Sequence, residues 1–165
     1  VYYHNNKSLC IIIMSSKKQW GNACWYLFHT LAYKLKEEHT NEIQNILNHI
    51  IAICSNLPCP DCSEHAIQTL NRLNRNAINS KESLVNAIFQ FHNIVNRHTG
   101  KSQFSRKEHD ELYARASFYP IYNNFWTVML INAKGERAMI YNLARKNALL
   151  NFDKYIKQNV HIFNI

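Results

Sequence analysis

The sequence predicts a mainly all-α protein built on a four-helix bundle. Helix breakers are rare, because the 165 residues include only 3 Gly and 3 Pro, while 47% of the residues are hydrophobic. That composition suits one domain with long helices and a substantial core. In four successive segments, apolar residues also recur at three- and four-residue spacings, as on one face of a helix. Four amphipathic helices joined by short connections pack as antiparallel neighbours.

The apolar stripes give the expected extent of these helices. We expect them at 20–36, from about 41 to Pro58, from about Cys59 to the polar turn 74–80, and at about 81–97. Thr40 or Asn41 can cap the second helix, and Gly100 follows the fourth as a C-terminal cap would. The inward residues of the first two helices would be Trp20, Ala23, Cys24, Leu27, Phe28, Leu31 and Leu35, then Ile43, Ile46, Leu47, Ile50, Ile51, Cys54 and Leu57.

Beyond the bundle, a short fifth helix is expected over 106–115, because Ser105 and Glu108 have the spacing of a capping box. Residues 125–131 are rich in aromatic and β-branched side chains, and 132–135 resemble a turn before a possible return strand at 138–141. We therefore expect a β-hairpin there, followed by a final helix over 143–158. Residues 117–165 would form a C-terminal extension packed on the bundle.

The charge and hydropathy of the chain restrict its partners. The formal charge is +8, and residues 117–165 carry six Lys or Arg against two acidic residues. Since there is no Arg-rich run or nucleic-acid-binding motif, we interpret this charge as a solvated face, not a nucleic-acid surface. No apolar stretch reaches the ~18–20 residues of a membrane span. Residues 1–13 lack the plan of a signal peptide, and Met14 is a candidate start, so we expect 1–13 to be a non-functional extension.

Two cysteines, Cys59 and Cys62, form a Cys-x-x-Cys motif with Pro58 and Pro60 on either side of the first. Proline at the first helical position would place Cys59 at a helix N-terminus, where backbone amides and the helix dipole stabilise a thiolate. A redox-active pair is the first interpretation. A zinc-stabilised interaction module using Cys54, Cys59, Cys62 and His65 is the alternative, and a pair of inert thiols is a third.

A second group of polar residues lies on a helix otherwise shaped for burial. His92, Asn93 and Asn96 crowd one turn, and buried polar side chains at this density need partners. On the first helix, Trp25 and His29 are four residues apart and can line one wall together. By themselves these residues are equally consistent with core packing.

Together, three blocks resemble the Erv/ALR family of FAD-linked sulfhydryl oxidases. They are Trp20-Gly21-x-x-x-Trp25-x-x-x-His29, Cys59-x-x-Cys62, and His92-Asn93-x-Val95-Asn96 with Gly100-Lys101, in that order within residues 20–113. The resemblance implies a helical bundle with FAD in its mouth, over residues 14–116. It also implies a thiol oxidase that forms disulfide bonds in protein dithiols and passes electrons through Cys59–Cys62 and FAD to oxygen, giving hydrogen peroxide.

The same resemblance assigns roles to individual residues. Cys62 would be the sulfur next to the flavin, and Cys59 the sulfur that meets the incoming thiol. The expected FAD-binding residues are Trp20, Gly21, Trp25, His29, Cys62, His92, Asn93, Val95, Asn96, Lys101 and Tyr113. No metal ligand is expected under this interpretation.

The remaining cysteines depart from the cellular members of that family. No cysteine follows Cys62, and Cys10 stands alone, so both the family's further structural disulfide and its shuttle pair are missing. In this respect the chain resembles the oxidases of large cytoplasmic DNA viruses. Cys24 and Cys54 lie on apolar helix faces, which favours buried free thiols over a bond between the two helices.

The resemblance also implies partners and a compartment. The expected partners are a protein dithiol or a thioredoxin-like relay protein, molecular oxygen and a second copy in a homodimer, without membrane or nucleic acid. The expected location is the host cytoplasm or the virion for a viral protein, and the mitochondrial intermembrane space for a cellular one.

Overall fold

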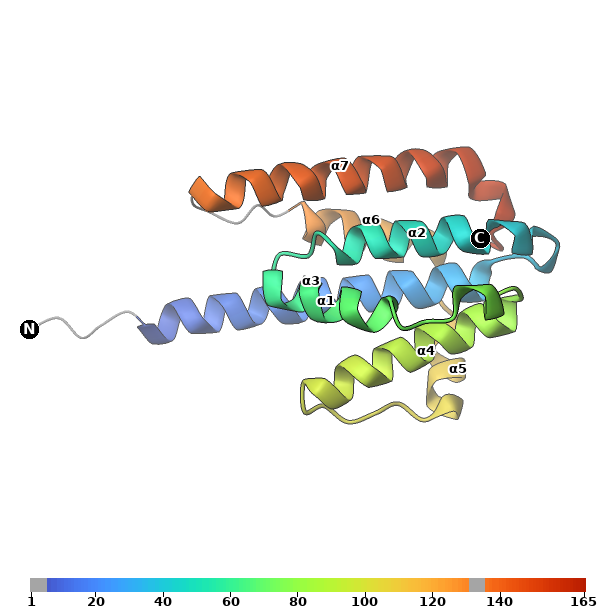
Figure 1. Ribbon diagram of the computed structural model, residues 1–165, viewed down its shortest axis with the longest axis horizontal. Coiled ribbons are helices and arrows are strands. Elements are labelled where there is room, and N and C mark those ends of the chain that lie inside the picture. The colour runs from blue at the N-terminus through green and yellow to red at the C-terminus, as the bar shows by residue number, and fades with distance from the viewer. Residues whose placement is uncertain (1–5, 131–135) are drawn as a thin grey trace, which may run out of the picture.

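The computed structural model is helical throughout the residues that it describes, which are 6–130 and 136–165, with side chains for 17–130 and 142–165 (Figure 1). The α-helices are α1 (Asn6–Lys34), α2 (Ile43–Cys54), α3 (Pro60–Leu70), α4 (Lys81–His98), α5 (Arg106–Ala114), α6 (Phe118–Met129) and α7 (Glu136–Asn159). Short 3₁₀ turns are η1 (Glu37–Glu42), η2 (Arg75–Ala77) and η3 (Val160–Ile162). Over the described ranges, strand pairing is limited to an isolated bridge between Leu35 and Phe163. The predicted all-α class is confirmed.

Helix α1 is the axis of the bundle. It contacts α4, α5 and α6, while α2 contacts α3 and α7. In Figure 1, α7 lies along the upper edge, α2 and α6 lie between α7 and α1, and α4 and α5 lie below. The first turns of α1 extend beyond the rest of the bundle in this view. The side of α1 that faces α3 and α4 is therefore the place where residues from the three sequence blocks can meet.

The helix boundaries agree closely with the local signals in the sequence. Both Ser80 and Ser105 accept a hydrogen bond from the backbone N–H three residues later, and each takes part in a reciprocal capping box. Gly100 has a φ of 68°, the left-handed conformation that favours glycine after a helix. The capping box predicted at Ser105 is confirmed. Two boundaries differ from the prediction. Helix α1 begins at Asn6 instead of near Trp20, and the N-cap of α2 is Glu42, which makes no side-chain cap, so the cap predicted at Thr40 or Asn41 is wrong.

The predicted β-hairpin is wrong. Residues 118–129, which include most of its expected first strand, form α6, and residues 138–141 belong to α7; the expected turn at 132–135 lies outside the described residues. Phe118, Phe125 and Met129 are buried at spacings of seven and four residues, which put them on one helical face. The strand preference of aromatic and β-branched residues depends on how their side chains pack, more than on the backbone. Residues 118–129 pack against α1 and bury one apolar face there as a helix.

The C-terminal helices share the core of the bundle. Phe125 of α6 and Phe152 of α7 are at most 1% exposed and belong to the same apolar cluster as Leu27 and Ile50. The chain end is also fixed to the end of α1, because Lys36 N–H donates to the Ile162 carbonyl at 2.9 Å. Helix α6 and the part of α7 whose side chains are described therefore take part in the same buried core as the first four helices.

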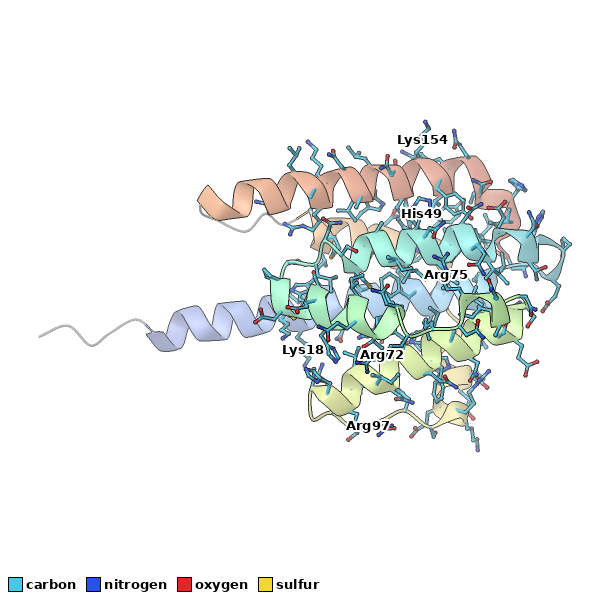
Figure 2. All side chains as sticks on the ribbon, in the orientation of Figure 1. Lys18, His49, Arg72, Arg75, Arg97 and Lys154 are labelled. Atoms are coloured by element: carbon cyan, nitrogen blue, oxygen red, sulfur yellow. A yellow bond between two sulfur atoms is a disulfide. The ribbon has the colours of Figure 1, made fainter. Side chains whose placement is uncertain are left out.

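Basic side chains are spread over several elements. Figure 2 labels Lys18 on α1, Arg72 after α3, Arg75 on η2, Arg97 on α4 and Lys154 on α7, so the positive charge extends across this face of the molecule. Such a distribution agrees with the interpretation as a solvated face. Among the described helices, none combines the length and the hydropathy needed to cross a membrane.

Candidate active site

The Cys59–Cys62 disulfide lies at the start of α3. Cys59 is the N-cap with extended backbone angles, Pro60 is the first helical residue, and the two sulfurs are bonded. The Cys62 N–H donates to Cys59 Sγ at 3.3 Å, so the helix N-terminus directs an amide at this sulfur. In addition, the Leu57 N–H donates to Ser63 Oγ at 3.0 Å, which holds the preceding loop against the first turn. This geometry would stabilise a thiolate at Cys59 after reduction.

A cavity of about 280 Å³ adjoins this disulfide on the side of Cys62. It is lined from α1, α3 and α4, the three helices that carry the sequence blocks. Aromatic faces come from Trp20, Trp25 and Phe91, and the cationic groups are Lys17 and Lys101. Gly100 places Lys101 there, since its left-handed turn lets the Lys101 N–H donate to the Asn96 carbonyl at 2.8 Å. The first cavity therefore combines a disulfide sulfur, flat rings and positive charge.

A second cavity, of about 270 Å³, shares Trp25, Asn96 and Lys101 with the first. Its other lining residues include His92, Tyr113 and Phe104. The His92 ring stacks on the Trp25 ring with a centroid distance of 4.0 Å and an interplanar angle of 10°. Because the two cavities share lining residues, they can accommodate successive parts of one elongated ligand.

Most of the predicted site residues line these cavities. Trp20, Gly21, Trp25, Cys62, Val95, Asn96 and Lys101 line the first cavity, and His92 and Tyr113 line the second. Two residues predicted to bind the cofactor, Asn93 and His29, line neither of these cavities. Asn93 bridges to the Phe104 backbone, donating to its carbonyl at 3.1 Å and accepting from its N–H at 2.9 Å. His29 is fully buried behind the second cavity.

His29 belongs to a chain of hydrogen bonds that the sequence analysis did not foresee. Its Nε2 lies 3.0 Å from His92 Nδ1, and its Nδ1 lies 2.8 Å from Nε2 of His109. His109 Nδ1 is 3.1 Å from the Tyr33 hydroxyl, which donates to the Asp110 carboxylate. The sequence does contain a signal for these residues, a His–Tyr pair at four-residue spacing that occurs twice. His29 and Tyr33 form one pair and His109 and Tyr113 the other, and each pair shares a helix face.

The arrangement does not fit the alternative zinc module. The sulfurs of Cys59 and Cys62 are bonded to each other, Cys54 is buried in α2, and His65 stacks on His98 with a centroid distance of 3.6 Å. Within the described part of the chain, no group of three or more His, Cys, Asp or Glu side chains is arranged to hold a metal ion. The four proposed ligands therefore do not converge.

A family comparison agrees with this site. Residues 22–114, more than half of the chain, match the model of the Erv1 / Alr family. The chain belongs to the Erv1/Alr family. The matched segment contains the disulfide, the whole of α4 and α5, and most of the residues that line the two cavities.

Named relatives of this Erv1/Alr protein come from plants and from viruses. It is 33% identical over 90 residues to FAD-linked sulfhydryl oxidase ERV1 of Oryza sativa subsp. japonica, a match covering 54% of this chain and 46% of the relative. It is 32% identical over 92 residues to putative FAD-linked sulfhydryl oxidase 096R of Invertebrate iridescent virus 3, covering 54% and 62%. A shorter match, 30% over 57 residues, is to probable FAD-linked sulfhydryl oxidase FPV093 of Fowlpox virus (strain NVSL), covering 34% and 56%. The chain thus spans about half to three fifths of the relatives that it matches.

Two further cysteines of this Erv1/Alr protein are buried and reduced. Cys24 and Cys54 are free, which confirms the predicted state. Burial raises the pKa of Cys24 to about 12, and burial together with Cys24 raises the pKa of Cys54 well above its ordinary value. Their thiols are consequently neutral and poor nucleophiles near pH 7, although both line the first cavity.

These thiol states can be counted directly. We expect the denatured, unreduced Cys10→Ser protein to react with two equivalents of a thiol reagent, and with four after reduction, because Cys24 and Cys54 are free and Cys59–Cys62 is bonded. An additional Cys24→Ser substitution should remove one equivalent from each count. A count of zero before reduction would contradict the assignment and indicate a Cys24–Cys54 bond.

The buried histidines should make stability depend on pH. Burial, followed by His109 and Lys101, lowers the pKa of His92 to about 4. A folded pKa below the unfolded value means that the unfolded chain binds more protons, so stability is retained above pH 6.5 and lost as the pH falls. For His92 alone the free energy of unfolding should fall by about 2 kcal/mol from pH 7 to pH 5. The ionisable groups surrounding the three rings are Tyr33, Tyr113, Lys101, Arg106 and Asp110.

Urea unfolding followed by circular dichroism at pH 7, 6 and 5 measures this effect. The His92→Gln protein is the matched control, because it lacks this titrating ring and should lose less stability over the same interval. Equal unfolding free energies at pH 7 and pH 5 in the unsubstituted protein would contradict the prediction.

Proposed function

We propose that this protein is an FAD-dependent sulfhydryl oxidase that forms disulfide bonds in protein dithiols and uses oxygen as the final electron acceptor. The observation that carries the proposal is the Cys59–Cys62 disulfide, whose Cys62 faces a cavity lined by aromatic rings and lysines. Membership of the Erv1/Alr family and relatives named FAD-linked sulfhydryl oxidases support it.

The disulfide would react by thiol–disulfide exchange. Of the two sulfurs, Cys62 lines the cavity and Cys59 does not, so an incoming thiolate meets Cys59 first. Its attack forms a bond to Cys59 Sγ and breaks the Cys59–Cys62 bond, releasing Cys62 as a thiolate. The second substrate thiolate then attacks the substrate sulfur of the mixed disulfide, giving the substrate disulfide and a Cys59 thiolate, which the α3 N-terminus stabilises. The two protons of the substrate thiols are released in these steps.

The residues present fit FAD in the two cavities. FAD has two flat ring systems joined through a pyrophosphate, and the cavities offer aromatic faces at either end with Lys101 lining both. Gly21 provides space, because a Cβ added there would meet no protein atom within 4 Å. When bound, FAD would supply the two-electron chemistry that links thiol oxidation to the reduction of oxygen to hydrogen peroxide. Trp20, Trp25, Val95 and Asn96 would hold it beside Cys62.

Substitution of Gly21 should separate cofactor binding from stability. Gly21 lines the first cavity and an added Cβ there meets no protein atom within 4 Å, so a Gly21→Leu side chain should occupy cavity space and greatly reduce FAD binding. It should also stabilise α1 by roughly 0.5–1 kcal/mol, since leucine is a far better helix former than glycine. Flavin content and thermal unfolding of the flavin-free proteins measure the two effects. Normal flavin content in the Gly21→Leu protein would contradict this placement of the cofactor.

An absorption spectrum with oxygen uptake tests the proposed function. The purified protein should be yellow with the two visible flavin bands, which should bleach when dithiothreitol is added and return in air. Oxygen consumption should depend on the dithiol and yield hydrogen peroxide. A colourless protein that does not take up FAD would overturn the proposal.

The finer assignments also remain part of the proposal. We propose protein dithiols, delivered directly or through a thioredoxin-like relay protein, as substrates, and a homodimer as the assembly. The viral relatives support the host cytoplasm or the virion as location, and the plant relatives leave the mitochondrial intermembrane space as the cellular counterpart. Sedimentation of the flavin-loaded protein tests the dimer.

A further inference from the structure

Five side chains connect the second cavity to the protein surface. His92 lines the cavity, His29 and His109 are both 0% exposed, and the Asp110 side chain is 46% exposed. The links are His92 Nδ1 to His29 Nε2 at 3.0 Å, His29 Nδ1 to His109 Nε2 at 2.8 Å, and His109 Nδ1 to the Tyr33 hydroxyl at 3.1 Å. The chain crosses from α4 through α1 to α5.

The exposed end of this chain determines the direction of every hydrogen bond. An ionised carboxylate can only accept, so the Tyr33 hydroxyl donates to Asp110. The Tyr33 oxygen then accepts from His109, which must carry its proton on Nδ1. A neutral imidazole has one donor and one acceptor, so His109 Nε2 accepts from His29 Nδ1, and His29 Nε2 accepts from His92 Nδ1. All three rings are consequently Nδ1–H tautomers.

Charge and burial keep Asp110 ionised and the three histidines neutral in this chain of hydrogen bonds. Partial burial alone would raise the pKa of Asp110, but hydrogen bonds from Tyr33, Arg106 and His109 hold the pKa below its ordinary value. Burial is the largest cause that lowers the pKa values of the three histidines, followed for His29 by His109 and His92. At neutral pH the carboxylate is therefore charged and the rings are neutral, which the tautomer argument requires.

The consequence appears at the cavity end. With its proton on Nδ1, His92 has an unprotonated Nε2, and within the described part of the chain this atom takes no hydrogen bond. The ring cannot rotate to exchange its nitrogens freely, because it is stacked on Trp25. His92, which lines the second cavity, thus has an Nε2 atom that can accept a hydrogen bond and cannot donate one.

We propose that Asp110 and Tyr33 are positioning residues that act through His109 and His29 to fix His92 as a hydrogen-bond acceptor for an N–H or O–H group of the cofactor in the second cavity. This inference rests on the proposed function, because the cofactor is the ligand. Asp110 itself is exposed and does not line the cavity, so its effect on binding would pass through the four other side chains.

Removal of Asp110 provides the main test. In the Asp110→Ala protein, the Tyr33 hydroxyl loses its acceptor and can donate to His109 Nδ1, which reverses each bond and moves the His92 proton to Nε2. The matched control is Asp153→Ala. The Asp153 carboxylate likewise accepts hydrogen bonds from the Tyr122 hydroxyl at 2.5 Å and from Lys157 at 2.7 Å, but among the described residues no chain of histidines is bonded to Tyr122. Tyr33→Phe is a second variant, in which Asp110 remains 3.4 Å from His109 Nδ1 and can preserve the direction.

Two measurements test the proposal, one of the His92 tautomer and one of the affinity for FAD. Nitrogen-15 NMR at pH 7, of the holoprotein and of the flavin-stripped protein, reports which imidazole nitrogen carries the proton, and flavin fluorescence gives the affinity of the flavin-stripped protein for FAD. We expect Nδ1–H at His92 in the unsubstituted, Asp153→Ala and Tyr33→Phe proteins. We expect the Nε2–H tautomer in Asp110→Ala, with FAD binding about 3- to 10-fold weaker, the range for loss of one hydrogen bond.

The outcomes separate this inference from the proposed function. An Asp110→Ala protein with an unchanged His92 tautomer would overturn the inference, as would a reversed tautomer with unchanged affinity for FAD. An equal loss of affinity in Asp153→Ala would also overturn it, because a general effect of surface charge would then explain the loss. Failure of the unsubstituted protein to bind FAD, despite the expected tautomer, would instead overturn the proposed function.

Discussion

The Cys62→Ser protein should retain bound FAD and lose dithiol oxidation almost completely, with turnover falling by at least about 1,000-fold. Cys62 is the sulfur on the cavity side of the disulfide, so without it Cys59 has no partner through which to pass electrons inward. Serine is nearly isosteric and keeps the first turn of α3, so the cavity and its cofactor should be unaffected. Oxygen uptake with dithiothreitol and the visible flavin spectrum measure the two properties together.

The Cys59→Ser protein is the matched control, because it removes the other sulfur of the same pair. It should also fail in turnover, but it leaves a thiol at Cys62 beside the flavin and should therefore differ from Cys62→Ser in its visible spectrum. The Cys24→Ser protein should retain turnover, because the buried neutral thiol of Cys24 takes no part in exchange. Undiminished oxygen uptake by the Cys62→Ser protein would contradict the assigned role.

The Phe125→Ala substitution should lower the free energy of unfolding by about 3–5 kcal/mol. Phe125 is 0% exposed in α6 and packs edge-to-face near Phe152 of α7, with ring centroids 6.1 Å apart. Its removal would leave a cavity where the C-terminal helices meet the core of the bundle. Chemical denaturation of the purified protein measures the change.

Tyr119→Ala is the control on the same helix. Tyr119 is 52% exposed, so its replacement should change stability by no more than about 0.5 kcal/mol. A loss below about 1 kcal/mol for Phe125→Ala would mean that α6 contributes little to the core. Such a result would contradict the packing of the C-terminal helices described above.

Much of the local structure was predictable from the sequence. The apolar spacing, the serine that caps α5, and the glycine after α4 are signals confined to a few neighbouring residues, and each appears in the structure. The Cys-x-x-Cys pair is local in the same sense, since Pro60 and the first turn of α3 bring the two sulfurs together. Helical periods and caps depend on interactions between residues up to four positions apart, which explains why these predictions succeeded.

The candidate site was predictable in part. Lining residues such as Trp25, Asn96 and Lys101 were named because they belong to motifs of a resembling family, not because the sequence shows them meeting. Asn93, by contrast, bonds to the Phe104 backbone, and His29 is enclosed by other histidines. A motif identifies which residues matter together but not which atom of each reaches a ligand.

The sequence by itself determined that four bundle helices follow one another in these segments, that the Cys-x-x-Cys pair stands at a helix start, and, through the family resemblance, which class of cofactor to expect. Only the tertiary structure decided that residues 118–129 form a helix, that Asn93 bonds to the Phe104 backbone, and that His29, His92 and His109 join in one chain of hydrogen bonds. These outcomes depend on contacts between residues distant in sequence. The free energy of such contacts comes from the apolar surface and hydrogen-bond partners that other helices provide, and no local pattern encodes it.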